Sequence, residues 1–165
     1  MPAVEIAAKD WLEDHSGRIA QECAVRLCLA CCAVLPSDRA FAKLVDEQVL
    51  ADLLELAFHG RRVMERRQLK SATIGSDPLW PPSSKAPPNG NLWDAFGIII
   101  HAESLTLVWE TPDLEGNPYQ SSGRKPKFAG SLTAKSDQGE VKLPIGAIAA
   151  SFIGSVLNQM AGTAK

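Results

Sequence analysis

The chain has 165 residues, of which 45% are hydrophobic and 22% charged, and this is enough for one folded domain, residues 1–165, with a substantial core. Its formal charge of -2 gives no general attraction to nucleic acid or anionic lipid, so a phosphate-binding site would have to be local. The first residues include acids and a tryptophan where a signal peptide needs a basic patch and an apolar run, so we expect a cytoplasmic protein with reduced cysteines.

Two long helices are predicted in the first half of the chain. Residues 17–35 are apolar except for a thin polar stripe at steps of four, which predicts a buried helix; the stripe is Arg18, Glu22 and Arg26. Residues 3–15 are also expected to be helical, with a break or kink at Ser16-Gly17. After Pro36, apolar residues such as Leu44 and Leu53 recur at helical spacing, which predicts a second helix antiparallel to the first, with Ser37 or Asp38 as its N-cap.

Shorter elements are predicted in the second half. The proline-rich stretch 71–90 is expected to be a loop, 92–102 a short helix capped by Asn91, and 104–111 a strand. A polar loop follows at 112–126. Residues 127–135 and 140–144 flank a polar turn and predict a β-hairpin, and Pro144 opens an apolar helix over 144–160. These elements predict an α+β fold, mainly α, with an antiparallel pair of long helices and a small antiparallel sheet.

Four cysteines lie within the first predicted helix, and three of them follow the C-x4-C-x2-C spacing of plant-type ferredoxins: Cys23, Cys28, Cys31 and Cys32. On a helix these residues spread over half of the circumference and cannot converge on one metal. We therefore expect buried thiols and no metal or other cofactor. Two alternatives are a partial metal site that uses Cys28 with Cys31 or Cys32, and redox chemistry.

A basic cluster ends the second predicted helix and contains Arg61, Arg62, Arg66, Arg67 and Lys70. Cations at this position favour the negative end of the helix dipole, so the cluster could be a solvated helix end. The functional alternative is contact with phosphate groups or RNA through the arginines.

His101 is the candidate catalytic residue. It ends the apolar segment 92–102, and Asp94 is expected two turns back on the same face. A histidine in such a place can satisfy a hydrogen bond in the core, or it can transfer protons near neutral pH.

The C-terminal segment carries no charge between Lys142 and Lys165, but its amides, serines and glycines make it a poor lipid-facing helix. We therefore expect no membrane association. Small residues recur every four positions and would let another helix approach closely, so we expect a packing face or a dimer interface made by Gly146, Ala150, Gly154 and Phe152.

Two long antiparallel helices with arginines on the second, a short helix that ends in "IIIHA", and then strands together resemble the HEPN group of helical proteins, common in prokaryotic toxin–antitoxin and phage-defence systems. The resemblance runs from about residue 17 to residue 102. It implies a dimer in which an arginine holds the scissile phosphate of RNA and a histidine shortly after it transfers protons, without metal. His101 matches the histidine, but Asp94, Ala95 and Phe96 occupy the positions of the arginine and cannot neutralise charge on phosphate.

We therefore expect a HEPN-like, non-catalytic protein that acts as a homodimeric regulatory or accessory partner in a bacterial toxin–antitoxin or defence-type system. One alternative is a metal-independent ribonuclease that uses His101 with Arg61 or Arg62. Another is an adaptor that binds a protein partner through the 71–90 loop and the hairpin.

Overall fold

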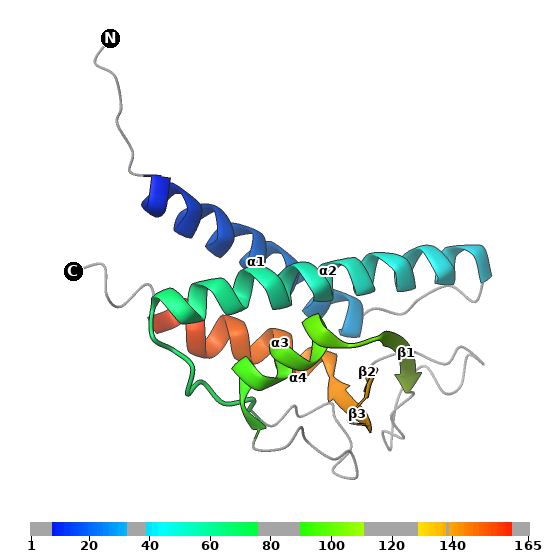
Figure 1. Ribbon diagram of the computed structural model, residues 1–165. Coiled ribbons are helices and arrows are strands. Elements are labelled where there is room, and N and C mark those ends of the chain that lie inside the picture. The colour runs from blue at the N-terminus through cyan, green and yellow to red at the C-terminus, as the bar shows by residue number, and fades with distance from the viewer. Residues whose placement is uncertain (1–7, 33–38, 76–89, 111–128, 138, 160–165) are drawn as a thin grey trace.

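The structure is a computed structural model that describes residues 8–32, 39–75, 90–110, 129–137 and 139–159. Its elements are, in chain order, α1 (Ala8–Cys32), α2 (Arg39–Arg66), α3 (Leu92–His101), β1 (Ser104–Glu110), β2 (Ala129–Ser136), β3 (Gly139–Pro144), α4 (Ile145–Ser151) and the π-helix η3 (Phe152–Leu157). Helices α1 and α2 lie against each other, α3 packs on α2, α4 packs on α1, and the sheet extends from one end (Figure 1). The fold is α+β and mainly α, as predicted.

Helix α1 runs without interruption through Ser16 and Gly17, so the predicted break there is wrong. Both residues are buried, Ser16 to 1% exposure, and the Ser16 hydroxyl lies 3.2 Å from Nδ1 of His59 on α2. Packing against α2 therefore outweighs the weak helix propensity of a serine–glycine pair.

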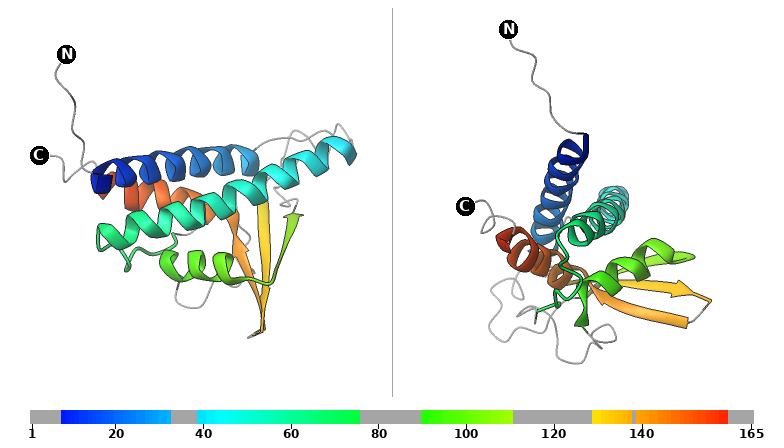
Figure 2. Two further views of the ribbon diagram at one scale, coloured as in Figure 1. Left: turned by 45° about the horizontal axis from the view of Figure 1, so that its top comes forward. Right: turned by 60° about the vertical axis from the view of Figure 1, so that its left-hand side comes forward.

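Helices α1 and α2 are antiparallel, as the left view of Figure 2 shows. Both present one apolar face to the core and leave the other face uncovered by any described element. Leu29 on α1 is 65% exposed and Leu44 on α2 is 64% exposed, so α1 is less buried than predicted and Leu44 is not in the core. The predicted N-caps Ser37 and Asp38 lie outside the described residues.

Helix α3 begins at the predicted cap. The Asn91 side chain accepts hydrogen bonds from the backbone N–H groups of Trp93 at 2.8 Å and Asp94 at 3.2 Å. Thr73 and Asn91 form an isolated antiparallel bridge that joins the two ends of the predicted 71–90 loop. Residues 76–89 of that loop, like the predicted loop at 112–126, lie outside the described residues.

The sheet is antiparallel with strand order β1-β2-β3. Strands β2 and β3 form the predicted hairpin, in which Lys135 is opposite Glu140 and Ser136 opposite Gly139. Gly139 has φ of +124°, a conformation that favours glycine at the turn. Leu132 and Leu143 point from the hairpin into the common core.

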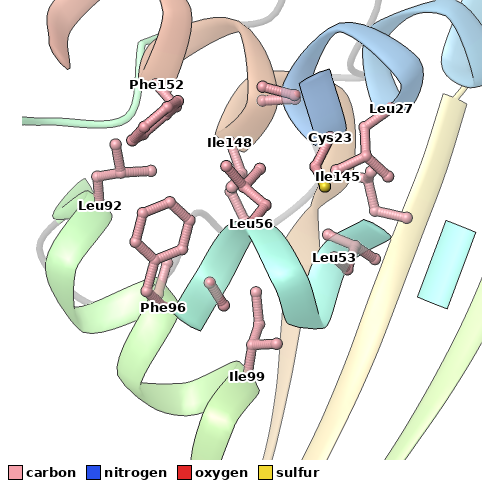
Figure 3. Packing of buried hydrophobic residues seen from close by; sticks show 14 of the residues in the cluster. Cys23, Leu27, Leu53, Leu56, Leu92, Phe96, Ile99, Ile145, Ile148 and Phe152 are labelled. Atoms are coloured by element: carbon pink, nitrogen blue, oxygen red, sulfur yellow. The ribbon is translucent and has the colours of Figure 1, made fainter. Parts of the chain in front are cut away.

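The core lies where α1, α2, α3 and the C-terminal helix meet (Figure 3). The rings of Phe96 and Phe152 are fully buried, with centroids 6.1 Å apart. A Cβ atom on Gly60 of α2 would lie 2.8 Å from Cε2 of Phe96 and 3.1 Å from Cε2 of Phe152. The missing side chain at Gly60 therefore allows α2 to approach both rings.

The C-terminal segment is helical, as predicted, but it is not α-helical throughout. Helix α4 follows Pro144, which stands at its N-cap with extended backbone angles, and continues into the π-helix η3. In the part of the chain that the structure describes, no helix is both long and apolar enough to cross a bilayer.

Candidate functional site

A pocket of about 700 Å³ opens between α2, α3 and the β2–β3 hairpin. We call it the α2–α3–hairpin pocket. Its charged and titratable lining residues are Arg61, Asp94, His101, Lys135, Asp137 and Glu140. A volume of this size suits a small molecule or one or two units of a polymer.

Arg61 enters the pocket from α2 and lies along the surface of α3. Its Cζ atom is over the indole of Trp93, 4.3 Å from the ring centroid, which is a cation–π contact. Its Nη1 atom is 3.1 Å from the point that a Cβ on Gly97 would occupy. The Arg61 guanidinium therefore lies against both Trp93 and Gly97.

His101 is exposed and lines the same pocket from the last residue of α3. Asp94 lines it from the first turn of the helix, so the two residues share a face as predicted. The structure thus brings His101 together with Arg61, one of the two arginines that the sequence offered as its partner.

The hairpin wall of the pocket is of mixed charge. Lys135 and Glu140 are cross-strand neighbours, and Asp137 lies in the turn between the strands. Arg61 is the cation at the α2–α3 end of the pocket, where Asp94 also lies, so an anionic group of a ligand would find its cationic partner there. Asp137 and Glu140 at the hairpin end can accept hydrogen bonds from polar groups of a ligand.

The predicted basic cluster is divided between surfaces. Of its four arginines, Arg61 lines the pocket. Burial lowers the pKa of His59, and the charge of nearby Arg62 adds to that effect, so Arg62 lies near His59 and does not line the pocket. Lys70 is 4.5 Å from the Trp93 centroid and forms a 3.8 Å ion pair with Glu65.

Arg66 is half-buried and Arg67 is exposed, and neither lines the α2–α3–hairpin pocket. Of the basic cluster that the sequence predicted as a phosphate contact, only Arg61 therefore lines this pocket.

A second polar cluster lies between α1 and α2. Nδ1 of His59 is 3.2 Å from the Ser16 hydroxyl, and Nε2 is 3.6 Å from a carboxylate oxygen of Glu55. The order serine, histidine, carboxylate is that of a hydrolase triad. However, Ser16 is 1% exposed and no substrate can reach it, so we interpret the cluster as a helix–helix contact.

Arg26 and Asp52 form the other polar contact between the two helices. The buried Asp52 carboxylate accepts from Nη2 of Arg26 at 2.7 Å and from Nε at 3.0 Å. Nη2 also lies 3.3 Å from the sulfur of Cys23. Burial, followed by the charge of Asp52, raises the pKa of the Cys23 thiol to about 11.

Of the three cysteines whose side chains the structure describes, Cys23 and Cys31 are buried and Cys28 is half-buried, and none of the three is in a disulfide. Among the described residues no group of three histidine, cysteine or acidic side chains is placed to hold a metal ion. Cys23, Cys28 and Cys31, which have the ferredoxin-like spacing, thus pack in or against the hydrophobic core.

The residues predicted as an interface are divided. Phe152 is fully buried against Phe96, whereas Ala150 and Gly154 are exposed and Gly146 is half-buried. A Cβ on Gly154 would meet no atom within 4 Å. The small residues therefore lie on the outside of the C-terminal helix, and the phenylalanine belongs to the core.

Sequence reasoning missed several residues of the site: Trp93 and Gly97 on α3, and Lys135, Asp137 and Glu140 on the hairpin. Gly97 was visible only as a small residue one turn before His101, and no local pattern connects Trp93 to an arginine 32 positions earlier. In the comparisons with known proteins, no family model matches the chain, and no curated protein or solved structure is significantly similar to it.

Proposed function

We propose that the protein binds RNA through a phosphate group in the α2–α3–hairpin pocket, and that it does so as a HEPN-like regulatory or accessory protein of a bacterial toxin–antitoxin or defence-type system. The observation that carries this proposal is that Arg61 and His101, from two different helices, line one pocket. A guanidinium binds phosphate oxygens through parallel hydrogen bonds, which suits this role.

The position of Arg61 on α3 supports the HEPN-like part of the proposal. In that group the arginine and the histidine come from one helix, and here Asp94, Ala95 and Phe96 hold the arginine positions. The Arg61 guanidinium lies against Gly97, one turn before His101 and next to those positions. An arginine from α2 thus lies on the exposed surface of α3, in the pocket that His101 also lines, whereas Ala95 and Phe96 face the core.

The acidic residues of the pocket weigh more heavily against cleavage than against binding. Asp94, Asp137 and Glu140 line the same pocket as Arg61, and they oppose the charge of a bound phosphate and, more strongly, the additional charge that develops on it during cleavage. We therefore place binding, and not catalysis, first.

Metal-independent RNA cleavage is the second candidate, because His101 is exposed in the pocket beside Arg61. In this reaction His101 would take the proton from a ribose 2′-hydroxyl, whose oxygen attacks the phosphorus. The 5′-oxygen of the next nucleotide would leave and take a proton from water, and Arg61 would hold the phosphate oxygens.

The binding test uses fluorescence anisotropy of a labelled single-stranded RNA with wild-type protein, Arg61→Ala and Arg62→Ala. Arg62→Ala is the matched control, since it removes the same charge one residue away on another face of α2. We expect Arg61→Ala to weaken binding on the order of tenfold or more, and Arg62→Ala to have a much smaller effect. Equal losses in the two variants, or no binding by the wild type, would contradict the proposal.

Cleavage is measured on the same RNA with a chelator present. Products that form with wild-type protein and are absent with His101→Ala would establish the ribonuclease and displace the accessory function. RNA that is bound but stays intact would support the accessory function.

We also propose a homodimer through the exposed small residues of the C-terminal helix. Gly154 is the test position, because among the described residues no atom lies within 4 Å of a Cβ placed there. Gly154→Trp is expected to keep the circular dichroism of the wild type and to convert a dimer into a monomer in light scattering. A dimer that persists in this variant would exclude an interface at Gly154.

A further inference from the structure

We infer that Trp93 and Gly97 are positioning residues for Arg61, which place its guanidinium at the α2–α3 end of the pocket. This inference rests on the proposed function for its effect on RNA, but the placement itself can be tested without any ligand. An unrestrained arginine samples many rotamers, and fixing one conformation in advance reduces the entropy lost on binding.

Trp93 supplies the attraction. The Arg61 Cζ atom is 4.3 Å and the Lys70 Nζ atom 4.5 Å from the centroid of its ring, so the indole contacts two cations. Lys70 is itself within 3.8 Å of Glu65. The attraction of the indole for each cation offsets the repulsion between Arg61 and Lys70. The indole itself carries no charge, so the positive charge of Arg61 is not neutralised by this contact and can still attract an anion.

Gly97 supplies the space. With Nη1 of Arg61 only 3.1 Å from the site of a Cβ, even a methyl group at position 97 would force the guanidinium to move by a few tenths of an ångström. Glycine in the interior of α3 lowers helix stability, and alanine would raise it. The cost in stability is explained if the space is needed for Arg61.

The first experiment compares Gly97→Ala with the wild type in thermal unfolding and in RNA binding. We expect Gly97→Ala to leave stability equal or higher and to weaken RNA binding several-fold. A purely structural role of Gly97 would make affinity and stability fall together.

A double-mutant cycle separates action through Arg61 from direct contact with RNA. In the Arg61→Ala background, Gly97→Ala and Trp93→Leu should cause no further loss of affinity, because the group that they position is gone. Trp93→Phe, which keeps a ring, should retain part of the affinity that Trp93→Leu loses. Losses that persist in the Arg61→Ala background would overturn the inference and leave the proposed function intact.

The ligand-free test uses NMR of the Arg61 side chain in the unbound protein. Protons held over an indole ring resonate upfield, and we expect this shift in the wild type and a smaller one in Gly97→Ala. Should the wild type fail to bind RNA, the proposed function would fail, and the ring-current shift would still decide the placement. Side-chain resonances at random-coil positions in the wild type would overturn the inference.

Discussion

Removing the Arg26 guanidinium should weaken the contact between α1 and α2. Asp52 is 4% exposed, and its carboxylate accepts from Arg26 Nη2 at 2.7 Å and from Gln48 Nε2 at 3.1 Å. The variant Arg26→Met keeps an apolar stem of similar length but leaves the buried carboxylate without its cation. Of the hydrogen bonds described above, only the one from Gln48 would remain, and a buried charge with so little compensation is unfavourable.

The expected loss lies between two limits. Breaking a fully buried ion pair costs about 3–5 kcal/mol, and breaking an exposed one costs less than about 1 kcal/mol. The Arg26 side chain is 49% exposed, so water can reach the place that the guanidinium leaves. We therefore expect the free energy of unfolding at pH 7 to fall by about 2 kcal/mol.

The assay is urea unfolding followed by far-UV circular dichroism. Arg18→Met is the matched control, because Arg18 is an exposed arginine of the same helix, and we expect its effect to stay within about 0.5 kcal/mol. The double variant Arg26→Met/Asp52→Leu removes both charges and should recover most of the stability. The reasoning is refuted by an Arg26→Met protein that unfolds at the same urea concentration as Arg18→Met.

Three further predictions concern the core and the helix contact. Gly60→Ala should lower the free energy of unfolding by about 1 kcal/mol, because crowding of the Phe96 ring outweighs the gain in helix propensity. Urea unfolding of this variant beside the wild type measures the change, and a Gly60→Ala protein that is more stable than the wild type would contradict the prediction. Burial lowers the pKa of His59 below its ordinary 6.5, so the unfolded chain takes up a proton first and stability should fall as the pH drops through that value. His59→Gln should flatten this part of the pH profile, and an unchanged slope would exclude His59 as its source. The thiol of Cys23, buried and with its pKa raised to about 11, should resist iodoacetamide at neutral pH until urea unfolds the chain, as mass spectrometry of peptides would show. Rapid labelling of the native protein at this residue would contradict the structure.

Much of the second half of the fold follows from local signals. The Asn91 cap, the alternation along β1 and the polar turn between β2 and β3 each act within a few residues, so the sequence predicts their elements directly. The break at Ser16-Gly17 was wrong for the opposite reason. Its local propensity is weak, and contacts with α2, far along the chain, decide the conformation.

The site could be predicted only in part. A basic helix end and a histidine on an apolar helix identified Arg61 and His101 as candidates. Arg61 and Arg62 are neighbours in sequence but differ by about 100° around the helix, so the docking of α2 decides which of them meets α3. Trp93 joins the site through tertiary contact alone, and no periodicity or spacing in a single sequence encodes that contact.

The walls of the α2–α3–hairpin pocket come from two parts of the molecule, helices on one side and the hairpin on the other. A ligand that fills the pocket contacts both parts at once and therefore stabilises the packing of the hairpin against the helices. A ligand that binds only when the hairpin is docked on the helices shifts the equilibrium toward the docked state, by an amount that its binding free energy sets. Amide protons of β2 and β3 should consequently exchange with solvent more slowly when the pocket is filled.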